Sequence, residues 1–204
     1  MNSGKPSPAM RQTLTAPAAR WLMQPGTVLG LLACAFFAVH AACQWWAGTS
    51  ENLLWACHAA DLFVGIGLLV RSRTVTAAGV LMLAIGVPLW LINLAYGGAF
   101  YPTSMLTHFG GLAVGIAGMH CLGVPERAWL TALGLTAVLL VASRVLTSPA
   151  ANVNLVYQAW QQFWPDLHAP EWHILALLAL WMALLWSVER SLRWLKVFPS
   201  QRAS

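Results

Sequence analysis

The stretch Thr74–Pro125, TVTAAGVLMLAIGVPLWLINLAYGGAFYPTSMLTHFGGLAVGIAGMHCLGVP, contains no Asp, Glu, Lys or Arg among its 52 residues. A helix needs about 20 apolar residues to cross the hydrocarbon core of a bilayer, so this stretch is too long for one span and long enough for two. The run Gly97-Gly98-Ala99-Phe100-Tyr101-Pro102 near its middle is typical of a turn. The stretch therefore predicts two transmembrane helices joined by that turn.

The rest of the chain has the same apolar character. Of its 204 residues, 59% are hydrophobic and only 8% are charged, whereas a soluble domain has about 25% charged residues. This composition excludes a water-soluble enzyme and predicts an all-α polytopic transmembrane helix bundle. We expect the bundle within residues 21–198, between a disordered basic tail (1–20) and a short C-terminal tail (199–204). Its six expected spans cover about 27–47, 53–70, 75–96, 104–122, 128–146 and 171–188, and 147–170 is compatible with a loop, an interfacial helix or a re-entrant segment.

The basic residues predict the orientation of the bundle. With six spans, only Arg144 of the eleven Lys and Arg residues lies at one end, and the positive-inside rule places the opposite, basic end in the cytoplasm. Both termini are therefore expected in the cytoplasm, and the expected location is a bacterial inner membrane. The net charge of +5 is explained by this basic rim, so the expected partner is the lipid bilayer and no nucleic acid. The ten rim residues are Lys5, Arg11, Arg20, Arg71, Arg73, Arg127, Arg190, Arg193, Lys196 and Arg202.

Polar residues gather on the other, outer side. Five of the six histidines and four of the six acidic residues are expected there. Ionisable side chains within a membrane usually face the bundle interior or a wet cavity, because their exposure to lipid is costly. His58 and Asp61 are three residues apart and share a helical face. Asp61, expected near the bilayer midplane, therefore belongs to an outward-facing polar cluster.

Three interpretations of this cluster remain open. The first is a transition-metal site, because imidazole, thiolate and carboxylate groups suit zinc, copper or iron, and two histidines would also suit a haem. The second is a proton- or solute-handling cavity around Asp61. The third is a set of hydrogen bonds that only hold the helices together. The candidate metal ligands are His40, His58, Asp61 and His108.

Two cysteines fall at matching depth on either side of the first predicted turn, Cys43 and Cys57. They would form a disulfide if the outer side is oxidising, or would serve as small core residues. Cys43 is also a candidate to complete a metal site.

A short echo marks two further polar positions. Val153–Tyr157 (VNLVY) repeats the pattern of Ile92–Tyr96 (INLAY), and each is followed by a proline and then a histidine. The echo suggests a duplicated hairpin unit. Asn93, Asn154 and His173 are therefore candidate ligand-binding residues, with loop capping as the alternative role of the two asparagines.

The same region carries a resemblance to a known group of proteins. Thr147-x-Pro149, then Asn152-x-Asn154-x-x-Tyr157, then Pro170-Glu171-Trp172-His173 at the start of the last helix resemble an uncharacterised family of bacterial six-helix integral membrane proteins. The resemblance covers about residues 53–195. It implies the fold and the membrane location, and it assigns no activity and no catalytic residue.

These observations favour a metal-binding site of a small membrane enzyme that acts on a lipid-like substrate. A non-enzymatic transporter or channel coupled to protons or cations is the first alternative. An accessory or assembly subunit is the second, in which case a larger membrane complex, or a homo-oligomer, would be the working unit.

Overall fold

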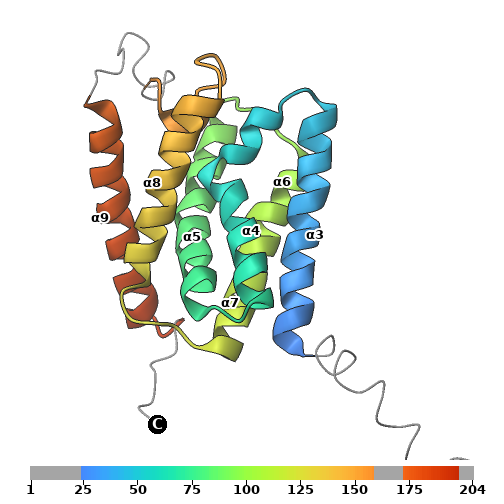
Figure 1. Ribbon diagram of the computed structural model, residues 1–204, viewed down its shortest axis with the longest axis vertical. Coiled ribbons are helices and arrows are strands. Elements are labelled where there is room, and N and C mark those ends of the chain that lie inside the picture. Colours follow the sequence, from blue (N-terminus) through green and yellow to red (C-terminus); the bar gives the residue numbers. More distant parts are fainter. Residues whose placement is uncertain (1–23, 159–171, 198–204) are drawn as a thin grey trace, which may run out of the picture.

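The computed structural model describes residues 24–158 and 172–197, and the described part is a bundle of helices without a β-strand (Figure 1). Its long helices run up and down in alternation, and the connections from α3 through to α8 are short. Two short 3₁₀ turns, η1 (Ser50–Leu54) and η3 (Val153–Leu155), lie at one end of the bundle. The helices are α3 (Pro25–Trp46), α4 (Ala56–Leu69), α5 (Arg73–Ala95), α6 (Pro102–Met105), α7 (Gly111–Leu122), α8 (Ala128–Leu146) and α9 (His173–Trp194).

Five helical segments are long and apolar enough to cross a membrane: α3, α5, the continuous run Pro102–Leu122, α8 and α9. The run Pro102–Leu122 consists of α6, one π-helical turn η2 (Leu106–Gly110) and α7. The sequence prediction of long apolar helices is therefore confirmed for these five.

The boundaries of two predicted spans change. The predicted span 53–70 becomes α4, which has only 14 residues, because the residues before it form η1 and Trp55 then turns the chain with extended backbone angles. The predicted span 171–188 becomes α9, whose helix continues to Trp194. Glu171 and the part of the segment 147–170 from residue 159 onward lie outside the described residues. So do both expected tails, together with residues 21–23 and 198 of the expected bundle.

Glycines allow α4 to pack closely against its neighbours on three sides. A Cβ at Gly65 would lie 2.5 Å from the Cys34 sulfur of α3, and a Cβ at Gly79 of α5 would lie 2.7 Å from the Ala60 carbonyl oxygen. On the third side, a Cβ at Gly115 of α7 would lie 3.2 Å from the Val64 side chain of α4. Such small-residue contacts bring helix backbones together in membrane bundles, where lipid removes the hydrophobic drive for association.

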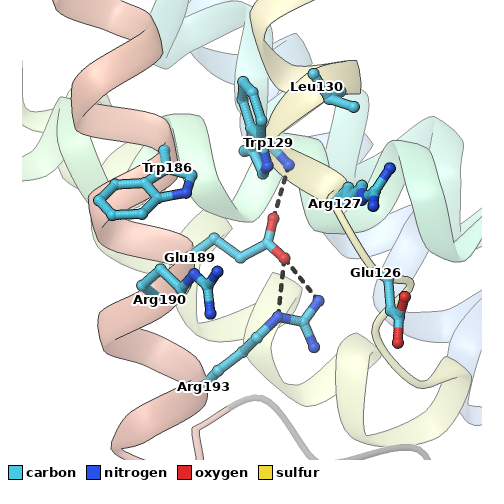
Figure 2. Close-up of a pocket in the computed structure, with 8 residues that line it drawn as sticks. All are labelled: Glu126, Arg127, Trp129, Leu130, Trp186, Glu189, Arg190 and Arg193. Atoms are coloured by element: carbon cyan, nitrogen blue, oxygen red, sulfur yellow. Dashed lines mark hydrogen bonds and ion pairs between the residues drawn. The ribbon is translucent and has the colours of Figure 1, made fainter.

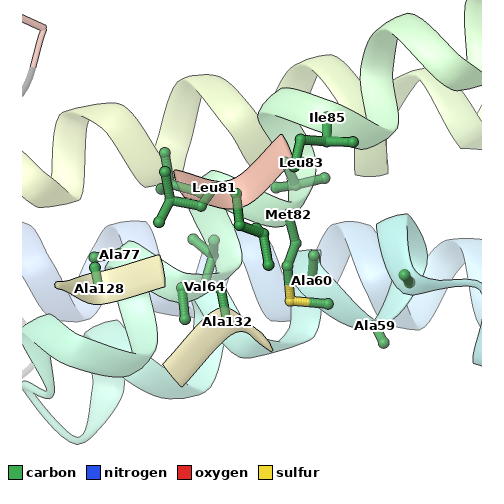
Figure 3. Close-up of a cluster of buried hydrophobic side chains, with 14 of the residues drawn as sticks. Ala59, Ala60, Val64, Ala77, Leu81, Met82, Leu83, Ile85, Ala128 and Ala132 are labelled. Carbon is green, nitrogen blue, oxygen red and sulfur yellow. The ribbon is translucent and has the colours of Figure 1, made fainter. Parts of the chain in front are cut away.

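The core lies between α4, α5, α7 and α8 (Figure 3). Helix α5 is buried over most of its length, and Leu81, Met82 and Leu83 are fully enclosed against Ala60 and Val64 of α4. The outer faces of the peripheral helices instead expose large apolar side chains, for example Val138 at 66% and Leu175 at 68%. Exposed apolar surface of this extent fits a lipid environment.

The basic residues that the structure describes segregate as predicted. Helices α3, α5 and α8 begin, and α4, α7 and α9 end, at the lower end of the bundle in Figure 1. Arg144, near the last turn of α8, lies at the upper end. That the lower end faces the cytoplasm stays a prediction. The basic residues of the lower end are Arg71, Arg73, Arg127, Arg190, Arg193 and Lys196.

Candidate metal centre

Three of the four candidate ligands form one cluster in the upper half of the bundle. His40 of α3, His58 of α4 and His108 of η2 are all buried. The ring centroids of His40 and His58 are 4.2 Å apart, and those of His58 and His108 are 5.4 Å apart. The sequence prediction that these three histidines meet is therefore correct. Rings in such close contact leave no room for a porphyrin between them, so this cluster does not fit a haem held by two of its histidines.

The orientation of His58 follows from the turn that precedes α4. Its Nδ1 lies 2.9 Å from the backbone carbonyl oxygen of Asn52, in η1. A carbonyl only accepts, so Nδ1 carries the proton and Nε2 of the neutral ring keeps a free lone pair. The 3₁₀ turn that shortens α4 thus selects the tautomer of His58.

His108 is held in the same way by its own helix. Its Nδ1 lies 2.7 Å from the Ser104 carbonyl oxygen, which also accepts from the Thr107 hydroxyl at 3.1 Å. Its Nε2 is buried and has no hydrogen-bond partner among the described residues. His108 stands in the π-helical turn η2, and π turns inside α-helices are frequent at functional sites. The result is a buried imidazole whose lone pair points at no donor.

Cys57 supplies a third donor atom. The metal-binding atoms of Cys57, His58 and His108 all lie within 4.8 Å of one another. Cys57 faces α5, because a Cβ at Gly86 would lie 2.6 Å from the Cys57 Cβ. The sequence reasoning did not name Cys57 as a ligand. Its one local signal is adjacency to His58 at the start of a helix.

His40 belongs to the cluster without being available as a ligand. The Gln44 side-chain oxygen accepts from the Thr49 hydroxyl at 2.5 Å, so its amide NH₂ faces Nε2 of His40 at 3.3 Å. Nδ1 of His40 then donates to the Thr103 hydroxyl oxygen at 2.9 Å. Both ring nitrogens are used, and the predicted ligand role of His40 is corrected to packing against His58.

Asp61 lies one helical turn below His58, between α4 and α7. It is fully buried, and neither carboxylate oxygen has a partner among the described residues. A Cβ at Gly111 would collide with its Oδ1, so only glycine leaves room for the carboxylate there. Asp61 is in the second turn of α4 and packs against Gly111, which lies at the middle of the run Pro102–Leu122, so its position halfway along that span agrees with the expected depth. It does not join the three donor atoms.

The candidate ligand-binding residues Asn154 and His173 hydrogen-bond to backbone groups of neighbouring elements. The Asn154 amide oxygen accepts from the Ala56 backbone N–H at 2.8 Å, and its NH₂ donates to the Leu54 carbonyl at 2.7 Å. His173 Nε2 contacts the Leu155 carbonyl at 2.8 Å. These bonds tie η3 to the start of α4 and to α9, and none of them involves a donor atom of Cys57, His58 or His108.

The two copies of the proposed repeat, Ile92–Tyr96 and Val153–Tyr157, differ in backbone conformation. Asn93 lies within α5, whereas Asn154 has a left-handed backbone with φ of 54°. The Asn93 carbonyl accepts from the Gly98 N–H at 2.9 Å and closes the turn after α5. Asn154 thus fixes its loop through its side-chain amide, whereas Asn93 closes its turn through its backbone carbonyl.

The suggested disulfide is not formed. All four cysteines are free thiols. Cys43 is exposed on the outer face of α3, beside Trp45 and Trp46, whereas Cys57 faces α5. The two predicted partners therefore point to different surroundings.

Comparison with protein-family models, with curated proteins and with solved structures gives no match to this chain. The family resemblance of the 147–173 region stays a prediction.

Proposed function

We propose that the protein is a six-span integral membrane protein that binds one transition-metal ion through Cys57, His58 and His108. The proposal rests chiefly on the Nε2 of His108, which is buried and has no partner among the described residues. A ring nitrogen of His108, a ring nitrogen of His58 and the Cys57 sulfur also lie within 4.8 Å of one another. A buried polar atom without a partner is rare in proteins and calls for an explanation. A bound cation provides one.

The fixed tautomers support the same assignment. His58 and His108 each direct Nδ1 at a backbone carbonyl and leave Nε2 free. Histidines that bind metals usually donate their other ring N–H to a carbonyl or carboxylate, which holds the ring in place. The rings are therefore oriented for coordination through Nε2.

The donor set selects the class of metal. One thiolate and two imidazoles suit zinc or copper, and disfavour magnesium and calcium, which prefer oxygen ligands. Donors bound to one zinc ion lie about 3.5 Å apart, given bonds of about 2.0–2.3 Å. The three atoms need to close by about 1 Å, which small side-chain rotations accomplish.

Three protein donors leave a further coordination position. In zinc enzymes that position holds a water, whose activation supplies a nucleophile. Because the site is buried in an apolar bundle, a substrate for such chemistry would be lipid-like. An enzymatic role of this kind depends on metal binding.

Metal content tests the proposal directly. The full chain is purified in mild detergent, stripped with a chelator and titrated separately with Zn²⁺ and Cu²⁺, with bound metal measured by elemental analysis. We expect one ion per chain, and with Cu²⁺ the visible absorption of a thiolate–copper bond. Cys57→Ser and His108→Ala should weaken binding by more than the roughly 10–100-fold loss typical of outer-shell substitutions.

The matched control is His120→Ala, which removes an exposed histidine of α7 outside the cluster. Its binding should equal that of the wild type, and near-identical helical circular dichroism of all variants shows that they fold. Binding that is absent in the wild type, or that survives both ligand substitutions, overturns the proposal.

A proton- or cation-coupled carrier is the second candidate, favoured by the fully buried, unpartnered carboxylate of Asp61. Such groups often lie on ion pathways in membrane proteins. Flux across liposomes that is lost in Asp61→Asn and retained in Cys57→Ser would support this function over the metal site.

A further inference from the structure

A second polar feature lies at the opposite end of the bundle and is independent of the metal centre. A pocket of about 450 Å³ opens between the start of α8 and the end of α9 (Figure 2). Three arginines, Arg127, Arg190 and Arg193, line it together with Trp129 and Trp186. We propose that this pocket binds the phosphate group of an anionic phospholipid.

The charges of the pocket favour an anion. Arg193 is paired with Glu189 at 2.7 Å, which neutralises one arginine. Arg127 and Arg190 form no ion pair within the described part of the chain, although Glu126 is also in the lining. Arg190 is held instead over the ring of Trp186, with its guanidinium carbon 5.6 Å from the ring centroid. Two exposed guanidinium groups are thus available, and guanidinium recognises phosphate by paired hydrogen bonds.

Hydrogen bonds within the protein fix the floor of the pocket without any ligand. Glu189 is buried, and besides Arg193 it accepts from the backbone N–H of Trp129 at 2.8 Å. Arg193 also donates to the Pro125 carbonyl at 2.5 Å. Figure 2 shows these groups converging from α9 on the first turn of α8. The brace fixes the two helices and leaves the other two arginines free at the rim.

Location and lining favour a lipid as the source of the phosphate. The pocket lies where one membrane-spanning helix begins and another ends, which is the level of lipid headgroups. Trp186 and Leu130, next to the arginines, are 48% and 47% exposed and offer apolar surface to an acyl chain. Basic pockets between transmembrane helices are known to bind anionic headgroups.

The test titrates the purified full chain in detergent with phosphatidylglycerol, phosphatidylcholine and inorganic phosphate, and measures bound lipid by native mass spectrometry and phosphate by calorimetry. We expect phosphatidylglycerol to bind more tightly than phosphatidylcholine. The double variant Arg127→Gln/Arg190→Gln should weaken it about 30-fold, at roughly fivefold per arginine. The control, Arg71→Gln/Arg73→Gln, removes the same charge from the same end outside the pocket and should weaken it less than threefold.

Equal binding of the two lipids, or equal losses in the two double variants, overturns the proposal. Inorganic phosphate that binds as tightly as phosphatidylglycerol overturns the lipid assignment and shows a soluble phosphate site.

Discussion

The imidazole of His108 lies flat against the indole of Trp90, with ring centroids 4.5 Å apart and planes inclined by 19°. Trp90 comes from α5 and is itself packed edge-on by Phe109 at 5.8 Å. The ring of His108 is therefore fixed by an aromatic surface on one side and by the Ser104 carbonyl at Nδ1. These two contacts determine where its free Nε2 points.

Replacing the stacking partner should loosen the metal without removing it. In Trp90→Leu we expect one ion per chain as before, bound about fivefold more weakly, because an aromatic pair contributes about 0.5–1.5 kcal/mol beyond burial. Competition with a chelator of known affinity measures the change. Trp186→Leu, in the distant pocket, serves as the control, and equal weakening in both variants contradicts the role of the stacking.

Asn154 should be the most important loop residue for stability. Asn154→Ala leaves the Ala56 N–H, the Leu54 carbonyl and the Ser143 hydroxyl without their partner, and it places alanine at a positive φ. We expect a loss of about 3 kcal/mol, since each buried group left unsatisfied costs about 1–3 kcal/mol. The thermal midpoint in detergent should fall clearly, whereas Asn93→Ala, at its half-buried position, should change it little.

Two glycines in transmembrane helices should respond oppositely to alanine. A Cβ at Gly79 would lie 2.7 Å from the Ala60 carbonyl oxygen and 2.9 Å from the Val64 nitrogen, and these backbone atoms of α4 have no room to move. Gly79→Ala should therefore lower the thermal midpoint by several degrees. Gly134→Ala in α8 meets nothing within 4 Å and should be neutral or stabilising by up to about 1 kcal/mol through helix propensity. Similar effects of the two changes would mean that α4 and α5 do not pack this closely.

The helices could be predicted well because the information for them is local. The length of an uncharged run and the residues at its ends place a membrane helix, and the predicted 128–146 and 104–122 differ little from Ala128–Leu146 and Pro102–Leu122. The predicted start of the second span, at residue 53, was wrong because apolar composition does not distinguish the 3₁₀ turn Ser50–Leu54 from an α-helix.

The candidate site could be predicted only in part. Helix depth brought His40, His58 and His108 to one level, since depth depends on position along the chain. Which nitrogen remains free depends on contacts across helices, such as the Gln44 amide that occupies His40. The inclusion of Cys57 depends on its packing against Gly86 of α5, which no local pattern records.

The pairing of α8 with α9 should depend on Glu189. Glu189→Ala removes the ion pair to Arg193 and the acceptor of the Trp129 N–H. We expect a loss of about 2–3 kcal/mol, seen as a lower thermal midpoint, because the partner guanidinium then stays partly buried without its counter-charge. Arg190→Ala removes a neighbouring exposed charge and should have a small effect. An unchanged midpoint in Glu189→Ala would show that the brace does not hold the two helices.

Asp61 should have opposite effects on the metal-free and the metal-bound protein. A dication bound by one thiolate and two neutral imidazoles keeps one positive charge, which a carboxylate one turn away balances, whereas without metal the buried carboxylate has no partner. Asp61→Asn keeps the shape and removes the charge, so the thermal midpoint of the stripped protein should rise while the metal binds roughly tenfold more weakly. The thermal midpoints of the wild type and of Asp61→Asn are each measured with and without Zn²⁺, and the metal affinity of each is measured by competition with a chelator. Asp166→Asn, outside the described residues, controls for the loss of one acidic charge. If Asp61→Asn lowers the stripped midpoint and leaves metal affinity unchanged, Asp61 supports the fold and does not balance the charge of the ion.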